Sequence, residues 1–132
     1  MFITLEADYA VRIVDCIAQS RGRLDAKSIS EQTGVTLRFS LKILRKLVAS
    51  GIVKSFKGTQ GGYELARKPE EISLKDVIET VEGKYRLSRC LSDDYDCNRG
   101  MSGSCKYQCI FNQISAEVDK KLESYTFDRF LE

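Results

Sequence analysis

The chain has 132 residues, a net charge of +2 and no histidine. This length suits one domain, and the missing histidine excludes Ser-His-Asp catalysis and His-ligated zinc or haem. No run of about 18 apolar residues is present, which excludes a membrane-spanning helix, and Glu6 and Asp8 stand where a signal peptide would be basic. We therefore expect a cytoplasmic protein without enzymatic activity.

Hydrophobic spacing predicts three helices in the N-terminal half. The first covers residues 5–20, where apolar residues recur at helical spacing. Asp25 is the expected N-cap of a second helix that ends near Gly34. Thr36 is the expected N-cap of a third helix, which continues to Gly51.

After these helices the spacing becomes that of a β-hairpin. Residues 52–56 and the segment YELA alternate like two strands around a Gly-rich turn. Three helices followed by a hairpin are the order of a winged helix-turn-helix.

The C-terminal half predicts a short helix, a loop and a long helix. Residues 73–81 suit a helix that begins with a capping box formed by Ser73 and Asp76. Residues 88–104 lack apolar periodicity, which is typical of a functional loop. A long amphipathic stripe follows, formed by Phe111, Ile114, Val118, Leu122 and Tyr125. Because such a stripe needs an apolar partner, we expect a homodimer.

The predicted fold is therefore mostly α-helical with a small β-hairpin wing. A winged helix-turn-helix domain would occupy residues 1–68. Residues 69–132 would form a second unit with the loop and the dimerisation helix.

Positive charge is concentrated on the third helix and the hairpin. Between Val35 and Gly62 there is no acidic residue and there are six basic ones: Arg38, Lys42, Arg45, Lys46, Lys54 and Lys57. Helical spacing predicts a core-facing side with Leu37, Leu41, Leu44 and Leu47, and an opposite side with Arg38, Lys42 and Arg45. This pattern favours nucleic-acid binding; a solvated face on an unrelated helical domain is the alternative.

Four of the five cysteines lie close together. Cys16 stands apart in the first helix, where a buried and inert thiol is expected. The others are spaced C-x6-C-x7-C-x3-C, at Cys90, Cys97, Cys105 and Cys109. Thiolates in a loop that enters a helix suit a soft metal centre, which favours an iron–sulfur cluster. Structural zinc, which usually shows closer pairs, and a redox thiol switch remain open.

Several segments resemble the Rrf2 family of bacterial winged-helix regulators, and together they cover nearly the whole chain. They are ITLEADYAVRIV, DAKSISEQTGVTLRFSLKILRKLVASGIV, the wing signature KGTQGGYELA, the loop cysteines and YTFDRFL. The resemblance implies a homodimeric repressor that binds double-stranded DNA at a palindromic operator. Family members contact DNA through the recognition helix and the wing, and many hold an iron–sulfur cluster that senses redox state, nitric oxide or iron–sulfur supply.

The resemblance also assigns DNA contacts and cluster ligands. Base or phosphate contacts fall on Thr36, Arg38 and Ser40. Lys42 and Arg45 contact phosphates if they face outward, and Lys57, Thr59 and Gln60 enter the minor groove. Three cluster ligands match Cys90, Cys97 and Cys105.

The fourth ligand is left open by the sequence. Gln108 stands where cluster-assembly repressors carry a histidine, so Asp8 from the other subunit or Cys109 is the candidate. Asp8 has an alternative role at the positive end of its helix dipole. We expect a 4Fe–4S cluster in preference to 2Fe–2S. The alternative functions are a zinc-binding or thiol-switch regulator, and an iron–sulfur electron-transfer protein that would not need the basic helix and wing.

Overall fold

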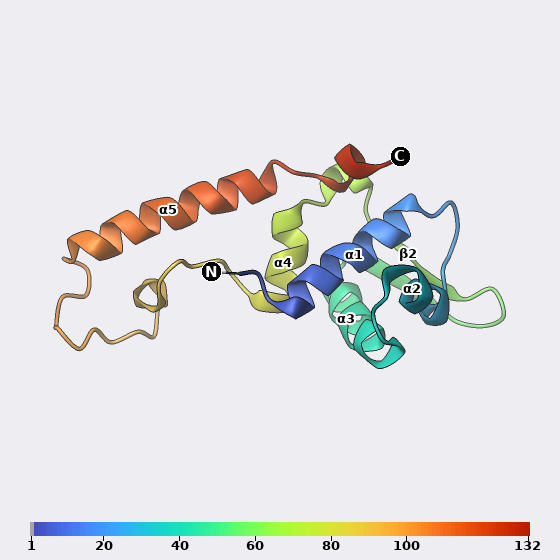
Figure 1. The fold of residues 1–132 in the computed structure, drawn as a ribbon, viewed down its shortest axis with the longest axis horizontal. Coiled ribbons are helices and arrows are strands. Elements are labelled where there is room, and N and C mark those ends of the chain that lie inside the picture. Colours follow the sequence, from blue (N-terminus) through green and yellow to red (C-terminus); the bar gives the residue numbers. More distant parts are fainter. Residues whose placement is uncertain (1) are drawn as a thin grey trace.

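The computed structural model describes residues 2–132, which form five α-helices and one antiparallel hairpin (Figure 1). In chain order these are α1 (Leu5–Gln19), α2 (Ala26–Thr33), α3 (Leu37–Ala49), β1 (Val53–Phe56), β2 (Gly62–Leu65), α4 (Leu74–Glu82) and α5 (Lys106–Glu123). Three short 3-10 helices are η1 (Pro69–Glu71), η2 (Arg89–Leu91) and η3 (Phe127–Phe130). The predicted winged helix-turn-helix with a long C-terminal helix is confirmed. None of these helices is long and apolar enough to cross a membrane.

The caps of α2 and α3 are those that the sequence predicts. The Asp25 carboxylate accepts a hydrogen bond of 2.7 Å from the Ser28 amide, and this bond lowers the pKa of Asp25. Gly34 ends α2 in the left-handed conformation, at φ 76°, which glycine adopts without a steric penalty. The Thr36 hydroxyl then accepts a bond of 3.3 Å from the Phe39 amide and starts α3. These caps fix the short turn between the two helices.

The hairpin is attached to the segment that precedes α2. Strands β1 and β2 pair in the register Val53–Leu65 to Phe56–Gly62. Leu24 extends the pairing, because its amide donates to the Tyr63 carbonyl at 3.1 Å and its carbonyl accepts from the Tyr63 amide at 2.7 Å. At Gly62, with φ 138°, a Cβ atom would lie 2.8 Å from the Leu24 carbonyl oxygen. Glycine is therefore required where the wing meets this segment.

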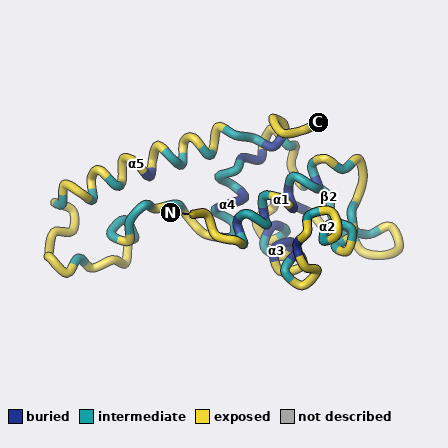
Figure 2. Tube along the Cα trace, viewed as in Figure 1, coloured by how far each residue is buried: buried dark blue, intermediate teal, exposed yellow. Residues whose placement is uncertain are grey.

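The hydrophobic core surrounds α1 and draws on both halves of the chain. Its side chains come from α1 to α4, β1 and η3, and the buried set includes Ile13, Ile29, Leu44, Ile72, Val77 and Phe127. Figure 2 shows the buried segments gathered in α1, α3 and α4, whereas α5 is mostly exposed or intermediate. The two units predicted on either side of residue 68 therefore contribute side chains to one hydrophobic core.

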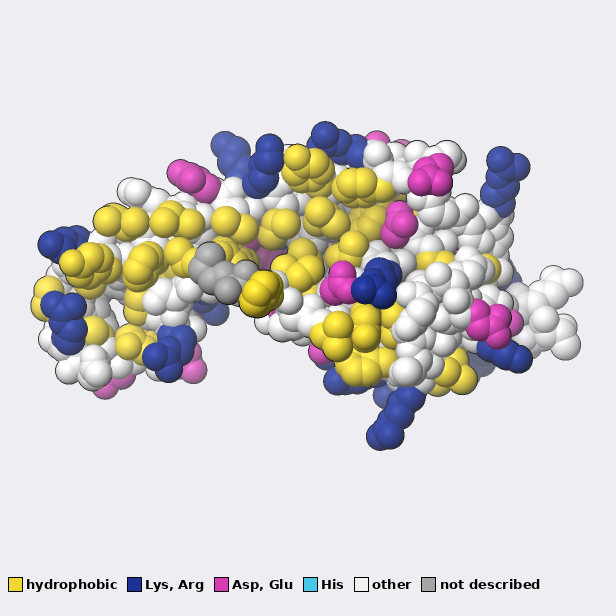
Figure 3. All heavy atoms as spheres, viewed as in Figure 1, with side chains coloured by type: hydrophobic (Ala, Val, Ile, Leu, Met, Phe, Trp, Pro, Cys, Tyr) yellow, Lys and Arg dark blue, Asp and Glu magenta, His cyan; other side chains and the backbone are white. Residues whose placement is uncertain are grey.

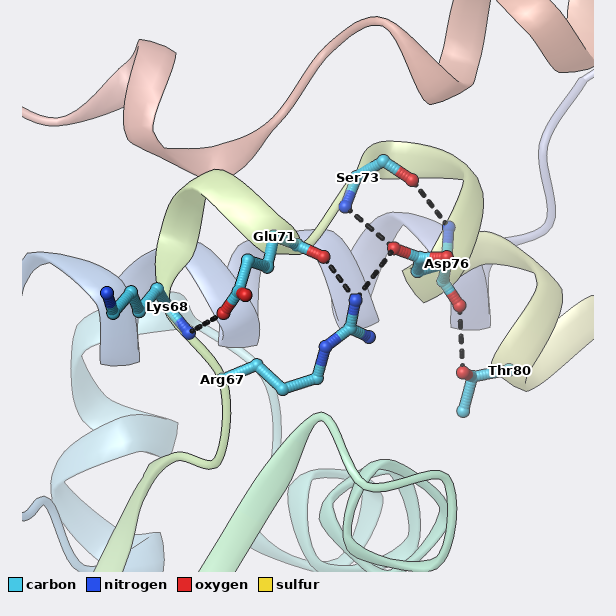
Figure 4. Close-up of polar contacts among 6 residues, drawn as sticks. All are labelled: Arg67, Lys68, Glu71, Ser73, Asp76 and Thr80. Carbon is cyan, nitrogen blue, oxygen red and sulfur yellow. Dashed lines mark hydrogen bonds and ion pairs between the residues drawn. The ribbon is translucent and has the colours of Figure 1, made fainter.

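A polar network connects the hairpin to α4 (Figure 4). Ser73 and Asp76 form the predicted capping box. The Asp76 carboxylate accepts a hydrogen bond of 2.9 Å from the Ser73 amide, and the Ser73 hydroxyl accepts one of 3.1 Å from the Asp76 amide. The Arg67 guanidinium donates to the Glu71 carbonyl and lies 3.9 Å from the Asp76 carboxylate. The segment between β2 and α4 is thus held by charged groups at the surface and by Ile72 in the core.

Helix α5 extends away from the winged helix, with the segment 83–105 folded back along it (Figure 1). It packs on α4 and η2. Its buried residue is Ser115, whose hydroxyl accepts from the Leu87 amide at 2.8 Å and donates to the Phe111 carbonyl at 2.8 Å. The large apolar side chains that stay exposed on α5 are Tyr107, Ile110 and Ile114. Of the predicted stripe, only Ile114 is exposed, and Phe111, Val118, Leu122 and Tyr125 are half-buried.

Candidate nucleic-acid interface and cysteine loop

Helix α3 turns a different side to the core from the one that the leucine spacing predicts. The buried residues are Ser40, Ile43, Leu44 and Leu47, whereas Leu37 is 46% exposed and Leu41 is 39% exposed. The prediction that Leu37 and Leu41 face the core is wrong. Helix α3 carries apolar residues on more than one side, and the core takes the side that places Ile43 beside Leu44 and Leu47.

The prediction that Ser40 contacts DNA also does not hold. Ser40 is fully buried, and its hydroxyl lies 3.4 Å from the Val35 carbonyl oxygen, to which it donates. A buried hydroxyl that is already paired is not accessible to a base or a phosphate. Its role is to connect α3 to the turn that precedes it.

The predicted cations of α3 are on the exposed side, and we call Arg38, Lys42 and Arg45 the basic face. Some of the neighbouring positive charge is neutralised by carboxylates from other elements. Glu6 lies 2.7 Å from the Lys46 amine and 3.9 Å from that of Lys42, and Glu64 lies 3.6 Å from the amine of Lys54.

Three cations of the basic stretch keep their charge uncompensated. Within residues 2–132, Arg38, Arg45 and Lys57 form no ion pair. Figure 3 shows dark blue side chains beside hydrophobic ones over α3. The positive surface is therefore narrower than the six basic residues suggest, and it is centred on α3 and the wing tip.

The wing tip presents Lys57, Thr59 and Gln60, which are all exposed. Arg23, in the segment before α2, contacts both the end of β1 and the turn of this wing. Its guanidinium lies 3.4 Å from the centre of the Phe56 ring and donates to the Gln60 carbonyl at 3.2 Å. No local pattern could have identified Arg23, because both partners lie on the hairpin, far along the chain.

Gln108 connects the two ends of the cysteine loop, residues 88–104, to α5. Its side-chain amide donates to the Cys90 carbonyl at 2.8 Å, and its carbonyl oxygen accepts from the Gly103 amide at 2.9 Å. The sequence marks Gln108 only as the residue that replaces a ligand. In the structure, the two hydrogen bonds of Gln108 hold the loop against the first turn of α5.

The candidate ligand cysteines lie on this loop and at the start of α5. Cys90 lies in η2, Cys97 in the exposed part of the loop, and Cys105 at the N-cap of α5. Cys109 follows one turn later, with its amide bonded to the Cys105 carbonyl at 3.2 Å. Cys105 and Cys109 line a hollow of about 350 Å³ that also contacts Gln108.

Two thiols have shifted pKa values, in opposite directions. The backbone amides of Met101 and Arg99 point at the Cys97 sulfur and lower its pKa. Burial, followed by the nearby charge of Asp15, raises the pKa of Cys16. Because the thiolate is the reactive form of cysteine, the lowered pKa gives Cys97 a larger thiolate fraction than Cys16 at the same pH. Cys16 is half-buried and not buried as predicted, and its raised pKa reduces its thiolate fraction.

The donor set suits a soft metal, because Cys90, Cys97 and Cys105 supply thiolates. In the part of the chain that the structure describes, no three cysteine or acidic side chains converge into a metal-binding group. The Asp8 carboxylate pairs with Arg12 at 2.7 Å on the surface of α1. The chemistry of the donors therefore fits the group, while residues 2–132 of one chain do not bring three such ligands together.

Comparison with known proteins gives a consistent family and fold. The sequence model of the Rrf2 family, described as an iron-dependent transcriptional regulator, matches residues 3–132. Protein aau3 of Rhizobium meliloti is 29% identical over 130 residues, which cover 97% of this chain and 83% of that protein. The HTH-type transcriptional regulator NsrR of Bacillus subtilis is 26% identical over 131 residues, covering 96% and 87%.

A solved structure of T. potens IscR superposes with a TM-score of 0.74 at 25% identity, covering 97% of this chain and 84% of that one. The fold described above is thus that of a known transcriptional regulator. The expectation of a regulator instead of an enzyme is confirmed by these relatives.

Proposed function

Because the chain belongs to the Rrf2 family of transcriptional regulators, we propose that it is a homodimeric repressor whose cysteine loop senses redox state, nitric oxide or iron–sulfur supply. The observation that carries the DNA-binding part is the exposed basic face of α3 next to a wing with a free cation. In this proposal α3 enters the major groove of a palindromic operator. Lys57, Thr59 and Gln60 reach into the minor groove.

Salt dependence of DNA binding tests this proposal. In this proposal Thr36 orients the end of α3. If Arg38, Lys42, Arg45 and Lys57 supply about three to four phosphate contacts per subunit, the plot of log K against log salt should have a slope of about −5 to −7 for a dimer. Lys57→Ala should reduce the slope by about 2 per dimer. Lys120→Ala, an exposed cation on α5, is the matched control and should leave it unchanged. A slope near zero would contradict the proposal.

The dimer is proposed from the exposed apolar residues of α5 and the N-terminus. Tyr107, Ile110 and Ile114 are 39–50% exposed, and Phe2, Ile3 and Leu5 are 50–99% exposed. Figure 3 shows hydrophobic side chains along α5 and over the middle of the same face. Contiguous apolar surface of this kind marks protein interfaces.

Analytical ultracentrifugation tests the dimer directly. Ile114→Glu should produce monomers, because it places an unpaired charge in the proposed seam. Gln113→Glu, which adds the same charge at the neighbouring exposed position of α5, should remain dimeric. A wild-type protein that sediments as a monomer at all concentrations would contradict this part of the proposal.

The sensor is proposed to hold an iron–sulfur cluster, 4Fe–4S in preference to 2Fe–2S, through Cys90, Cys97 and Cys105. When bound, such a cluster supplies iron that reacts with oxidants or nitric oxide. Asp8 of the partner subunit or Cys109 is the fourth ligand. Support comes from the thiolate donors and from Gln108, which holds the Cys90 and Gly103 backbones beside Cys105.

Anaerobic absorption and metal analysis distinguish the possible metal centres. A brown protein with iron and sulfide supports the cluster, and Cys97→Ser should then remove it. Asp8→Ala and Cys109→Ser, recorded separately, identify the fourth ligand. A colourless protein with one zinc per chain would contradict the cluster and favour the zinc alternative.

A thiol switch is the second candidate function, and the lowered pKa of Cys97 is the observation that favours it. In a protein without metal, peroxide would oxidise the Cys97 thiolate to a sulfenic acid and be reduced to water, and a dithiol would reduce the sulfenic acid back to the thiol. The DNA affinity of the protein should change on treatment with peroxide and recover with dithiothreitol, and Cys97→Ser should abolish the response.

A further inference from the structure

A row of exposed leucines lies beside the basic face of α3. Residues four apart in a helix lie above one another on the same side, so Leu37, Leu41 and Arg45 form one row. Arg38 and Lys42 form the adjacent row. Leu37 is the first residue of α3, and both leucines lie in the N-terminal half of the helix, with exposed fractions of 46% and 39%.

The surroundings of this row favour a polyanion as the occupant. The two leucines share an open hollow of about 860 Å³ with Phe39 and the three cations of the basic face. A second copy of the same surface would bring like charges together, which disfavours self-association there. The required partner combines dense negative charge with small apolar groups.

We propose that Leu37 and Leu41 recognise thymine by packing on its 5-methyl group in the major groove. The inference rests on the proposed function, because it requires α3 to enter that groove. The base edges there present hydrogen-bond donors and acceptors, and the thymine methyl is the apolar group that distinguishes this base. The N-terminal residues of a recognition helix are those that approach base edges. Arg38, Lys42 and Arg45 then hold the flanking phosphates and fix the register.

The test uses duplexes enriched from a random DNA library by binding to the full chain. Each thymine of an enriched duplex is replaced by uracil, which keeps the base pair and removes only the methyl group. We expect at least one replacement on each half-site to lower affinity by about three- to fivefold, the effect of losing one buried methyl group. Leu41→Ala or Leu37→Ala should weaken binding to the thymine duplex and equalise the thymine and uracil affinities at the corresponding position.

Leu131→Ala is the matched control, because Leu131 is 42% exposed but lies at the C-terminal end of the chain. It should keep the full preference for thymine. The inference is overturned if uracil is tolerated at every position, or if the preference survives in both leucine variants. If the library yields no bound duplex, the DNA-binding proposal fails first; an enriched duplex without a methyl effect overturns only the thymine contact.

Discussion

The winged-helix body (residues 2–82 and 126–132) and the C-terminal arm (residues 83–125) are held together by different forces. All buried hydrophobic side chains of the described residues belong to the body. The arm buries one residue, Ser115, and its loop is attached to α5 by the hydrogen bonds of Gln108 and Ser115. Regions with few buried apolar contacts open at low free-energy cost. The arm is therefore the part of the molecule that a ligand or a partner subunit can reorganise while the body stays intact.

The largest effect should come from the segment that returns from the arm to the body. Phe127, which is 1% exposed, lies in the body core. Phe127→Ala should lower the free energy of unfolding by about 3–5 kcal/mol, as measured by urea denaturation. Phe130→Ala is the control, because this neighbouring ring is 40% exposed, and it should cost less than half as much. Equal effects would show that residues 126–132 are not part of the core.

The next effect concerns the two hydrogen bonds by which Gln108 orders the arm. Gln108→Ala removes two hydrogen bonds, each contributing about 0.5–1.5 kcal/mol. The Gly103 amide should then exchange its hydrogen roughly 10 to 100 times faster, while urea denaturation of the body is unchanged. Gln113→Ala, at an exposed position of the same helix, should have no effect on this amide. Unchanged exchange in Gln108→Ala would mean that other contacts order the loop.

The contrast between body and arm also explains what the sequence could predict. Asp25, Thr36 and the Ser73–Asp76 capping box are local signals, because the cap and the amide it binds are three residues apart. The helix bounds and the hairpin follow from such signals. They also follow from hydrophobic spacing, which the body core enforces.

The failed predictions depend on tertiary contacts. Helical spacing alone does not determine which side of α3 faces the core, because this helix carries apolar residues on more than one side. The surroundings predicted for Leu37, Leu41 and Ser40 are therefore wrong. Glu6 neutralises Lys46 from α1, so a count of charges in the α3 segment overestimates the basic surface. The Gln108 hydrogen bonds join residues at the two ends of the loop, and no local sequence pattern indicates them. Apart from that of Ser40, the DNA contacts stay predictions, as do the cluster ligands.

A smaller effect is expected on hydrogen exchange in the wing. Arg23→Ala removes the stacking on Phe56 and the bond to the Gln60 carbonyl, together about 1–2 kcal/mol. The Gly61 amide, which bonds to the Gly58 carbonyl at 3.0 Å in the turn, should exchange its hydrogen about 5 to 30 times faster. Arg21→Ala is the control, because it removes an exposed arginine from the same connection. Equal exchange in the two variants would show that Arg23 does not order the wing.

The finest comparison is between one thiol of the arm and one of the body. The Met101 and Arg99 amides lower the pKa of Cys97, with a further contribution from the Arg99 charge. Burial and Asp15 raise the pKa of Cys16. Alkylation by iodoacetamide follows the thiolate fraction, so the rate at Cys97 should rise at lower pH than the rate at Cys16. Mass spectrometry of the metal-free protein across a pH series follows both rates in one sample and gives the order of the two midpoints.

This last prediction concerns the pH midpoints of the two alkylation rates and not their absolute values, because burial slows access to Cys16 independently of its pKa. Arg99→Ala should raise the Cys97 midpoint only slightly, since the backbone amides that dominate the shift remain. The Cys16 midpoint should not move, because Asp15 and its burial in the body are unaffected. If the two cysteines titrate together in the wild type, the arm does not activate its thiol, and the thiol-switch function loses its support.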